Sequence, residues 1–208
     1  MTPWNNFYDF ALPDLPGCPL GALNMALREA AIVFCEHSLG WKQTHSPVAV
    51  VAGTSQYLFA PPLESVVHAV IHAGFNGRAV EPYASQPDRQ IEQWRKRTGT
   101  PEYIAGDATS LTLIPEPDSD GILTMAVVLK PSPTAAGIDD SMFNEYRAAI
   151  IHGALARLML SPKKPYTNAQ LAAYHRHQFT IETAAAGTRA ARKFSRAPLK
   201  TAIQGRRK

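Results

Sequence analysis

The chain has seven histidines and two cysteines, the residue types best suited to bind a metal ion or to act as a nucleophile. His68 and His72 lie four residues apart on a predicted strand, which separates them by about 13 Å. His175 and His177 lie two residues apart on a predicted helix, so they point about 200° apart around its axis. Because neither pair can chelate one ion unaided, we predict no metal site and no cofactor.

Cys18 and Cys35 are too few for a disulfide framework or for the four ligands of a structural zinc site. Cys35 falls within an apolar helical segment, where packing explains it better than chemistry. The sequence also lacks the motifs of phosphate-binding loops, dinucleotide-binding folds, serine hydrolases and zinc proteases. We therefore predict that the protein is not an enzyme. The alternative is an enzyme whose site is assembled across distant loops of the β region.

The positive charge of the chain is concentrated at its C-terminal end, where residues 187–208 carry eight Lys and Arg residues and no acid. The other 13 Lys and Arg residues stand against 17 Asp and Glu residues, so residues 1–186 have a net charge of −4. This asymmetry indicates an anionic partner for the tail, either nucleic acid or an acidic groove on a protein; a solvated terminus without a partner is the alternative. The candidate partner-binding residues are Arg189, Arg192, Lys193, Phe194, Arg196, Lys200, Arg206, Arg207 and Lys208.

Three long helices are expected, because apolar residues recur at spacings of three and four in three segments of the chain. The last of them leads into the tail. Gly40 is placed to end the first helix in a left-handed conformation. The third helix carries an apolar stripe of Leu171, Tyr174, Gln178, Ile181 and Ala185. The predicted helices span residues 20–39, 139–160 and 167–187.

Asp139 or Asp140 can cap the second helix, and Thr167 or Asn168 can cap the third. Between Trp41 and Ser132 the apolar period changes to two, which predicts short strands with one helix at residues 87–98 among them. Asn76-Gly77 and Asp120-Gly121 are predicted as hairpin turns, since such pairs tolerate positive φ. The predicted strands span residues 48–52, 56–60, 65–73, 78–81, 103–105, 110–114 and 122–130.

The simplest packing places helix 20–39 against residues 139–187 and leaves residues 41–132 as an insertion. The predicted fold is therefore α+β: a helical bundle with an inserted, small β-sandwich or barrel-like module. Residues 1–19 are predicted to be an extended N-terminal arm, because their prolines disfavour helix, and residues 188–208 a basic C-terminal tail. The sequence contains neither a signal peptide nor an apolar run near the ~20 residues of a membrane span, so we expect a soluble protein without membrane contact.

Five short sequence segments, taken in their order and spacing along the chain, resemble segments of the head-to-tail adaptor (connector) proteins of tailed bacteriophages. The resemblance covers about residues 41–186 and does not include the N-terminal arm. The segments are YLFAPP (57–62), WRKRTGTPEY (94–103), LTLIPEP (111–117), AAIIHGALARL (148–158) and YTNAQLAAYH (166–175).

The resemblance implies a structural virion protein without enzymatic activity, made in the cytoplasm of the host bacterium and located at the head–tail interface. Such adaptors form a ring of twelve copies under the portal protein, extend the channel for the packaged DNA, and provide the platform for tail or nozzle proteins. The C-terminal tail would lie against the portal. From this role we expect a monomer in isolation and a ring on the portal.

Two other functions stay open from the sequence. One is a head-closure or tail-completion protein further down the tube. The other is a DNA-binding protein that uses its basic C-terminal tail, which would bind duplex DNA with a steep dependence on salt.

Overall fold

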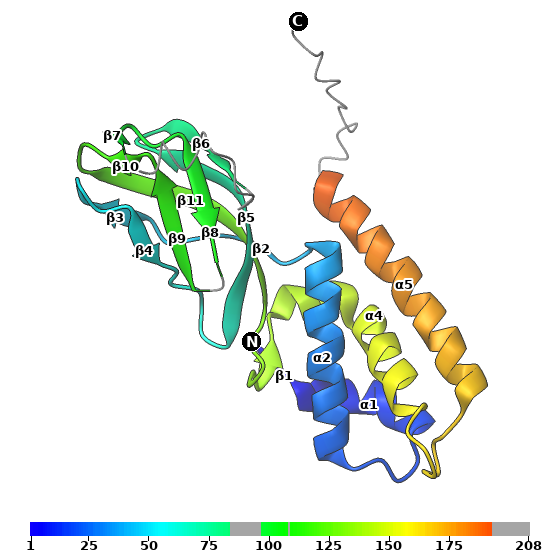
Figure 1. Cartoon of the computed structure of the whole chain (residues 1–208). Coiled ribbons are helices and arrows are strands. Elements are labelled where there is room, and N and C mark those ends of the chain that lie inside the picture. The colour runs from blue at the N-terminus through cyan, green and yellow to red at the C-terminus, as the bar shows by residue number, and fades with distance from the viewer. Residues whose placement is uncertain (84–96, 108, 193–208) are drawn as a thin grey trace, which may run out of the picture.

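The computed structural model describes residues 1–83, 97–107 and 109–192, and within these ranges it is a mixed α+β structure with four α-helices and a curled sheet (Figure 1). The long helices lie side by side at one end of the molecule and the sheet lies at the other. The α+β class predicted from the sequence is confirmed. The helices are η1 (Trp4–Phe7), α1 (Tyr8–Ala11), η2 (Leu12–Asp14), α2 (Leu20–Ser38), α4 (Asp140–Leu158) and α5 (Ala169–Arg192), where η marks a 3₁₀-helix.

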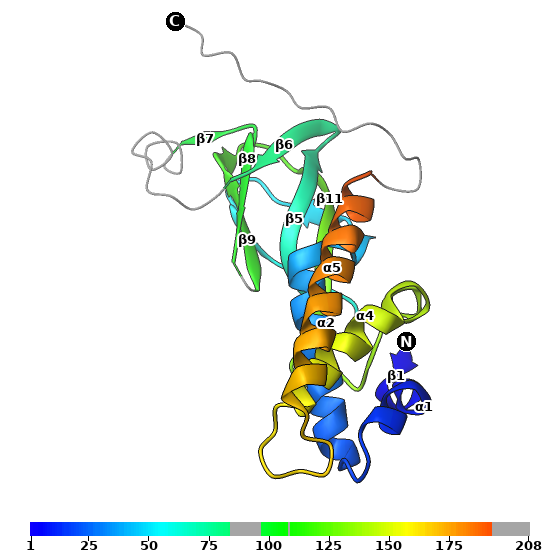
Figure 2. The ribbon, with the colours of Figure 1, turned by 90° about the vertical axis from the view of Figure 1, so that its right-hand side faces the viewer.

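The helices α2, α4 and α5, together called the helical layer, pack on one another through a continuous apolar core (Figure 2). Close approach is possible because residue 153, where α4 crosses its neighbours, is a glycine. A Cβ atom on Gly153 would lie 2.8 Å from the Cβ of Ala30 in α2 and 2.9 Å from the ring of Phe179 in α5. The predicted packing of residues 20–39 against residues 139–187 therefore agrees with the contacts in the structure.

The ends of α2 and α5 differ from the prediction. Leu39, not Gly40, takes the left-handed conformation after α2, with φ of 51°, and its N–H donates to the Cys35 carbonyl. Helix α5 does not end at Gly187 but continues to Arg192. The alanines before Gly187 favour helix, and Gly187 itself has no positive φ that would end it. Residues 188–192 thus belong to α5 and not to a tail.

The side chains of Asp139 and Asn168 cap α4 and α5. The Asp139 carboxylate accepts a hydrogen bond of 2.9 Å from the Ser141 N–H. The Asn168 side-chain oxygen accepts from the N–H groups of Gln170 and Leu171, at 3.1 and 3.0 Å. In each pair of candidates, the residue directly before the first helical residue is the cap.

The stripe predicted for the third helix is not its packed side. Leu171, Tyr174 and Ile181 are 45%, 53% and 49% exposed. The buried residues of α5 are small or polar, which allows the helix axes to approach closely, and the half-buried Phe179 ring packs beside them. The fully buried residues of α5 are Ala172, His175, Thr183 and Ala186.

Residues 1–19 do not form an extended arm, and this prediction was wrong. After β1 (Thr2–Pro3) the chain turns through η1, α1 and η2. Trp4 and Phe7 are buried against the helical layer, and the Trp4 indole N–H donates to the Ala135 carbonyl at 2.8 Å. The prolines do not prevent these helical turns because Pro13 stands at the start of η2, where its missing N–H costs no hydrogen bond.

The sheet is one hydrogen-bonded path of strands in the order β2-β11-β5-β6-β8-β9-β4, with β3 also paired to β11. Its curvature comes from the two longest strands, β5 and β11, whose pairing is interrupted by two register shifts. The strands of the sheet are β2 (Lys42–Thr44), β3 (Val48–Val50), β4 (Gln56–Leu58), β5 (Ser65–Phe75), β6 (Arg78–Pro82), β8 (Tyr103–Gly106), β9 (Ser110–Ile114) and β11 (Gly121–Pro131). Two small ladders pair β7 (Thr98–Gly99) with β10 (Glu116–Pro117), and β1 with β12 (Gly137–Ile138).

One of the two predicted hairpin turns is confirmed. Asn76 and Gly77 both have positive φ, 49° and 81°, and connect β5 to β6. Asp120-Gly121 was wrongly predicted as a hairpin turn, because β11 pairs with β2, β3 and β5 and not with the preceding β9 or β10. Gly121 serves close packing instead, since a Cβ atom there would lie 2.5 Å from the ring of Phe75.

Most of the predicted helix 87–98 lies outside the described residues, and Thr98 belongs to β7. Residues 193–208 also lie outside them. Among the helices that the structure describes, none combines the length and the apolar character that a membrane crossing requires.

Candidate assembly surfaces

The C-terminal end of α5 carries the two candidate partner-binding residues that the structure describes, Arg189 and Arg192. The Arg189 guanidinium lies 3.8 Å from the Glu145 carboxylate of α4 and 5.8 Å from the centre of the Tyr146 ring. The Lys42 ammonium, at the start of β2, donates to the Ala190 carbonyl at 2.7 Å. These contacts attach the end of α5 to α4 and to strand β2 of the sheet.

Arg189 therefore has a partner in its own subunit, which the sequence did not predict. Burial raises the pKa of the Tyr146 phenol, and the nearby Glu145 carboxylate raises it further, so this ring stays neutral at physiological pH. The other candidates, Lys193, Phe194, Arg196, Lys200, Arg206, Arg207 and Lys208, lie outside the described residues.

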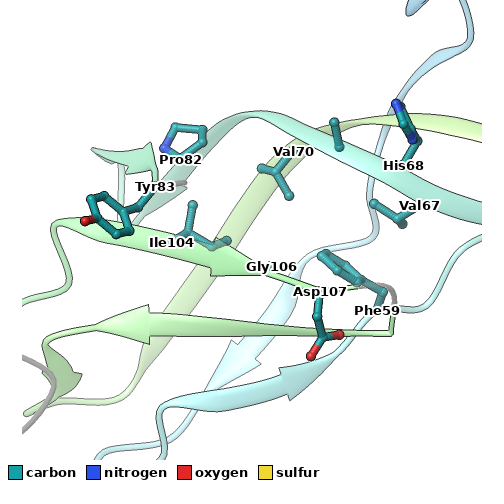
Figure 3. Close-up of a pocket in the computed structure, with 10 residues that line it drawn as sticks. Phe59, Val67, His68, Val70, Pro82, Tyr83, Ile104, Gly106 and Asp107 are labelled. Atoms are coloured by element: carbon teal, nitrogen blue, oxygen red, sulfur yellow. The ribbon is translucent and has the colours of Figure 1, made fainter. Parts of the chain in front are cut away.

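The curled sheet holds an apolar groove of about 320 Å³, called the β groove (Figure 3). Phe59, Val70 and Ile104 contribute apolar surface from three different segments of the sheet region. Asp107 stands at its edge, but its carboxylate accepts from the N–H groups of Thr109 and Ser110 at 2.8 and 2.7 Å. These hydrogen bonds lower the pKa of Asp107. Its carboxylate therefore stabilises the turn before β9.

Two histidines that the sequence did not connect meet between α4 and α5. His152 Nδ1 lies 2.7 Å from His175 Nδ1, so one ring donates and the other accepts. His152 Nε2 lies 3.9 Å from the Glu182 carboxylate, and the Tyr174 ring packs edge-on against both imidazoles. Burial lowers the pKa of His175, and the neighbouring His152 lowers it further.

The two histidines are 23 residues apart and lie on different helices, so no pattern at short spacing connects them. In the sequence, the nearest histidine to His175 is His177, which points to another side of the same helix. His68 and His72 are both exposed on β5. Within the described ranges, no group of three His, Cys, Asp or Glu side chains could hold a metal ion. Burial raises the pKa of Cys35 to about 12, so its thiol stays protonated and packs in the core.

The described residues thus form an α+β protein in which a helical layer is joined to a curled sheet, with a cationic helix end and apolar surfaces that are suited to contacts with other macromolecules. The chain belongs to the SU10 adaptor protein family, whose model matches residues 10–202. It is therefore a head-to-tail adaptor of a bacteriophage and a structural protein of the virion, as the resemblance in its sequence implied. The match continues past Arg192 into the cationic segment. A search among curated proteins found no match.

Proposed function

We propose that this adaptor docks under the portal protein as a ring of twelve copies, extends the channel for packaged DNA, and provides the platform for tail or nozzle proteins. In this proposal it has no catalytic step and is made in the cytoplasm of the host. The observation that carries the proposal is the attachment of the α5 end to α4 and β2, directly before the cationic residues 193–208.

A fixed starting point matters because a cationic segment loses less conformational entropy on binding when one of its ends is already held. Residues 193–208 can span at most about 55 Å when extended, enough to cross the width of a neighbouring subunit. Acidic grooves on the portal would attract the cations of this segment. Residues 1–186 have a net negative charge, so they would not themselves bind the phosphates of the DNA in the channel.

We propose further that residues 20–40 and 139–187 form one helical bundle, and that residues 41–132 are a β module inserted into it. The entry and exit of this module lie side by side, since the Leu129 N–H donates to the Trp41 carbonyl at 2.8 Å. An insertion whose two ends meet leaves the packing of its host helices undisturbed.

Removing residues 193–208 tests the proposal, because it deletes seven of the nine candidate residues and none of the residues that the structure describes. Truncation at residue 188 would be a poorer test, since it also removes the contacts of Arg189 and Ala190. We expect portal binding in co-sedimentation to weaken by about tenfold or more. Thermal unfolding should stay within about 0.5 kcal/mol of that of the full chain.

A full-length control with Lys193, Arg196, Lys200, Arg206, Arg207 and Lys208 replaced by Gln separates charge from length. If charge is recognised, this variant binds the portal as weakly as the truncated chain. Normal docking of both variants would contradict the proposed anchor, and electron microscopy that places the ring below another adaptor would assign the chain to head closure or tail completion.

A second candidate function, DNA binding through the same cationic residues, is favoured by the concentration of charge in residues 189–208. It predicts binding to duplex DNA without portal, with log K falling against log salt by about 0.9 for each phosphate neutralised. Equal binding to portal particles with and without packaged DNA would exclude this role for the segment.

A further inference from the structure

One edge of the long strand β5 is open beside the β groove. β5 pairs with β11 from Ser65 to Phe75, but β6 pairs only with its last three residues, 73–75. On the β6 side, residues 65–72 have no partner strand among the residues that the structure describes. Alternate residues of such an edge present an N–H and a C=O group, which another strand can bond.

The β groove places an apolar surface next to this edge, to which Val70 of β5 and Ile104 of β8 contribute (Figure 3). A helix or a folded surface in this groove would leave the N–H and C=O groups of the edge without partners. An extended peptide can bond to the edge and place every second side chain in the groove, which is how peptides bind by strand addition. The groove therefore fits an extended segment with apolar residues at a spacing of two.

The C-terminal segment of the chain contains such a pattern. Residues 199–203 have the sequence Leu-Lys-Thr-Ala-Ile, in which the large apolar side chains and a β-branched threonine stand at every second position. Threonine and isoleucine favour extended backbone. As a strand, the segment would direct Leu199, Thr201 and Ile203 to one face and its lysine to the opposite face, towards solvent.

The point where this segment leaves the described fold is level with the β groove. The Lys42 side chain of β2 donates to the Ala190 carbonyl near the end of α5. In the sheet, Lys42 lies opposite Val128 of β11, and Val128 lies opposite Ala69, which lines the groove. Ala69 is therefore two strand spacings, about 10 Å, from Lys42. Residues 193–198 span up to about 20 Å when extended, so the segment after them can reach the groove of its own subunit.

We infer that, in the free adaptor, residues 199–203 lie in the β groove of their own subunit as a strand added to β5. The short tether gives the segment an effective concentration in the millimolar range, which a second copy at micromolar concentration does not reach. A strand of this length makes few hydrogen bonds, each with a small net contribution, so the contact is weak and the segment can leave. Under the proposed function, docking on the portal would displace it from the groove.

Disulfide trapping tests this contact in the full chain without knowledge of the register. Ala69→Cys places a thiol in the groove, and the native Cys18 and Cys35 are buried. It is combined in turn with Leu199→Cys, Lys200→Cys, Thr201→Cys, Ala202→Cys and Ile203→Cys. Successive residues of a strand point to opposite faces, and a disulfide needs facing Cβ atoms. Under mild oxidation, we expect the best yield among positions 199, 201 and 203 to exceed those at 200 and 202 by about fivefold or more.

Gln43→Cys in place of Ala69→Cys is the matched control. Gln43 is exposed on β2, closer to the end of α5 than the groove is, so a segment without a site would reach it at least as easily. We expect low and similar yields from all five positions with this control. A flat profile with Ala69→Cys, or one highest at positions 200 and 202, would overturn the inference. Cross-linked dimers in place of the intramolecular product would also overturn it, because the occupant would then be a second copy.

The inference and the proposed function fail separately. Replacing the six Lys and Arg residues of the segment by Gln leaves Leu199 and Ile203 in place, so the cross-link from Thr201→Cys should persist while portal binding weakens. Leu199→Asp with Ile203→Asp should abolish that cross-link, and its survival would overturn the inference without touching the portal role. A cross-link yield that stays unchanged when portal is added would contradict the proposed anchor and support the contact within the subunit.

Discussion

At the scale of single residues, neighbours from another helix limit the side-chain size at one position of α4 and shift the pKa of one histidine of α5. Gly153 and His152 are neighbours in α4: Gly153 meets α2 and α5, and His152 meets His175 of α5. Their importance comes from what faces them, and each supports a prediction about stability.

Gly153→Ala should destabilise the protein by about 1–3 kcal/mol, since the added methyl would lie 2.8 Å from the Ala30 Cβ and 2.9 Å from the Phe179 ring. Gly21→Ala is the matched control on α2, because no atom lies within 4 Å of its added Cβ. This control should be neutral or stabilising by about 0.5–1 kcal/mol. Urea unfolding measures both, and equal effects would contradict the close approach at Gly153.

The His152–His175 pair should make stability depend on pH. The pKa of His175 is lowered in the folded state, so the unfolded chain binds more protons below about pH 6.5. Stability is therefore highest above that pH and falls as the pH is lowered towards the depressed folded pKa. Asp14 opposes part of this shift, and Glu182 faces the other side of His152.

His175→Gln should reduce the loss of stability between pH 7.5 and pH 5, as measured by thermal unfolding at each pH. The histidines outside the pair are present in both proteins, so their contribution cancels in the comparison, and what differs is the His152–His175 contact. An unchanged pH profile in the variant would show that the pair does not control the acid response.

At the scale of elements, the N-terminal segment is a structural part of the helical layer. Trp4 is buried, donates to the Ala135 carbonyl at 2.8 Å, and packs against Phe7. Phe7 in turn contacts Phe143 of α4 edge-on, with 4.9 Å between ring centres. The segment thereby connects α4 with the chain that leaves the sheet.

Trp4→Ala should cost about 3–5 kcal/mol of unfolding free energy, because it removes a buried ring and one of the two side-chain donors to the Ala135 carbonyl. Leu63→Ala provides the control, since Leu63 is 88% exposed and its loss should stay within about 0.5 kcal/mol. Chemical denaturation tests both. A small effect at Trp4 would mean that residues 1–15 do not contribute to the helical layer.

At the scale of the whole molecule, the proposed role requires that the adaptor does not close a ring before it reaches the portal. The described helices expose only scattered large apolar side chains, so we expect a single contact between two free copies to be weak. In the proposed role, docking of neighbouring copies on one portal would raise their effective concentration, so the ring would close there.

Purified protein should therefore sediment as a monomer of 22.7 kDa at micromolar concentration, and rings should form only after portal is added. Sedimentation velocity with and without portal measures both states. A stable oligomer in the absence of portal would contradict assembly on the platform.

Local patterns in the sequence predicted most elements. The helices 20–39 and 139–160, the Asn76-Gly77 turn and the strand 110–114 follow from periodicity and turn chemistry, which depend on neighbouring residues only. The bounds of the strands differ by a few residues, because the ends of β5 and β11 are set by their partners.

The sequence by itself determined the order of the three long helices and of the main strands, the cationic end of the chain and its family, because each is carried by residue types at short spacing. The tertiary structure alone decided which side of α5 is buried, since Gly153 and the small side chains of α5 let the helices approach on the less apolar side. It likewise decided the folding of residues 1–19 onto the helical layer and the meeting of His152 with His175. These features depend on contacts between residues far apart in the chain, and no local pattern encodes them.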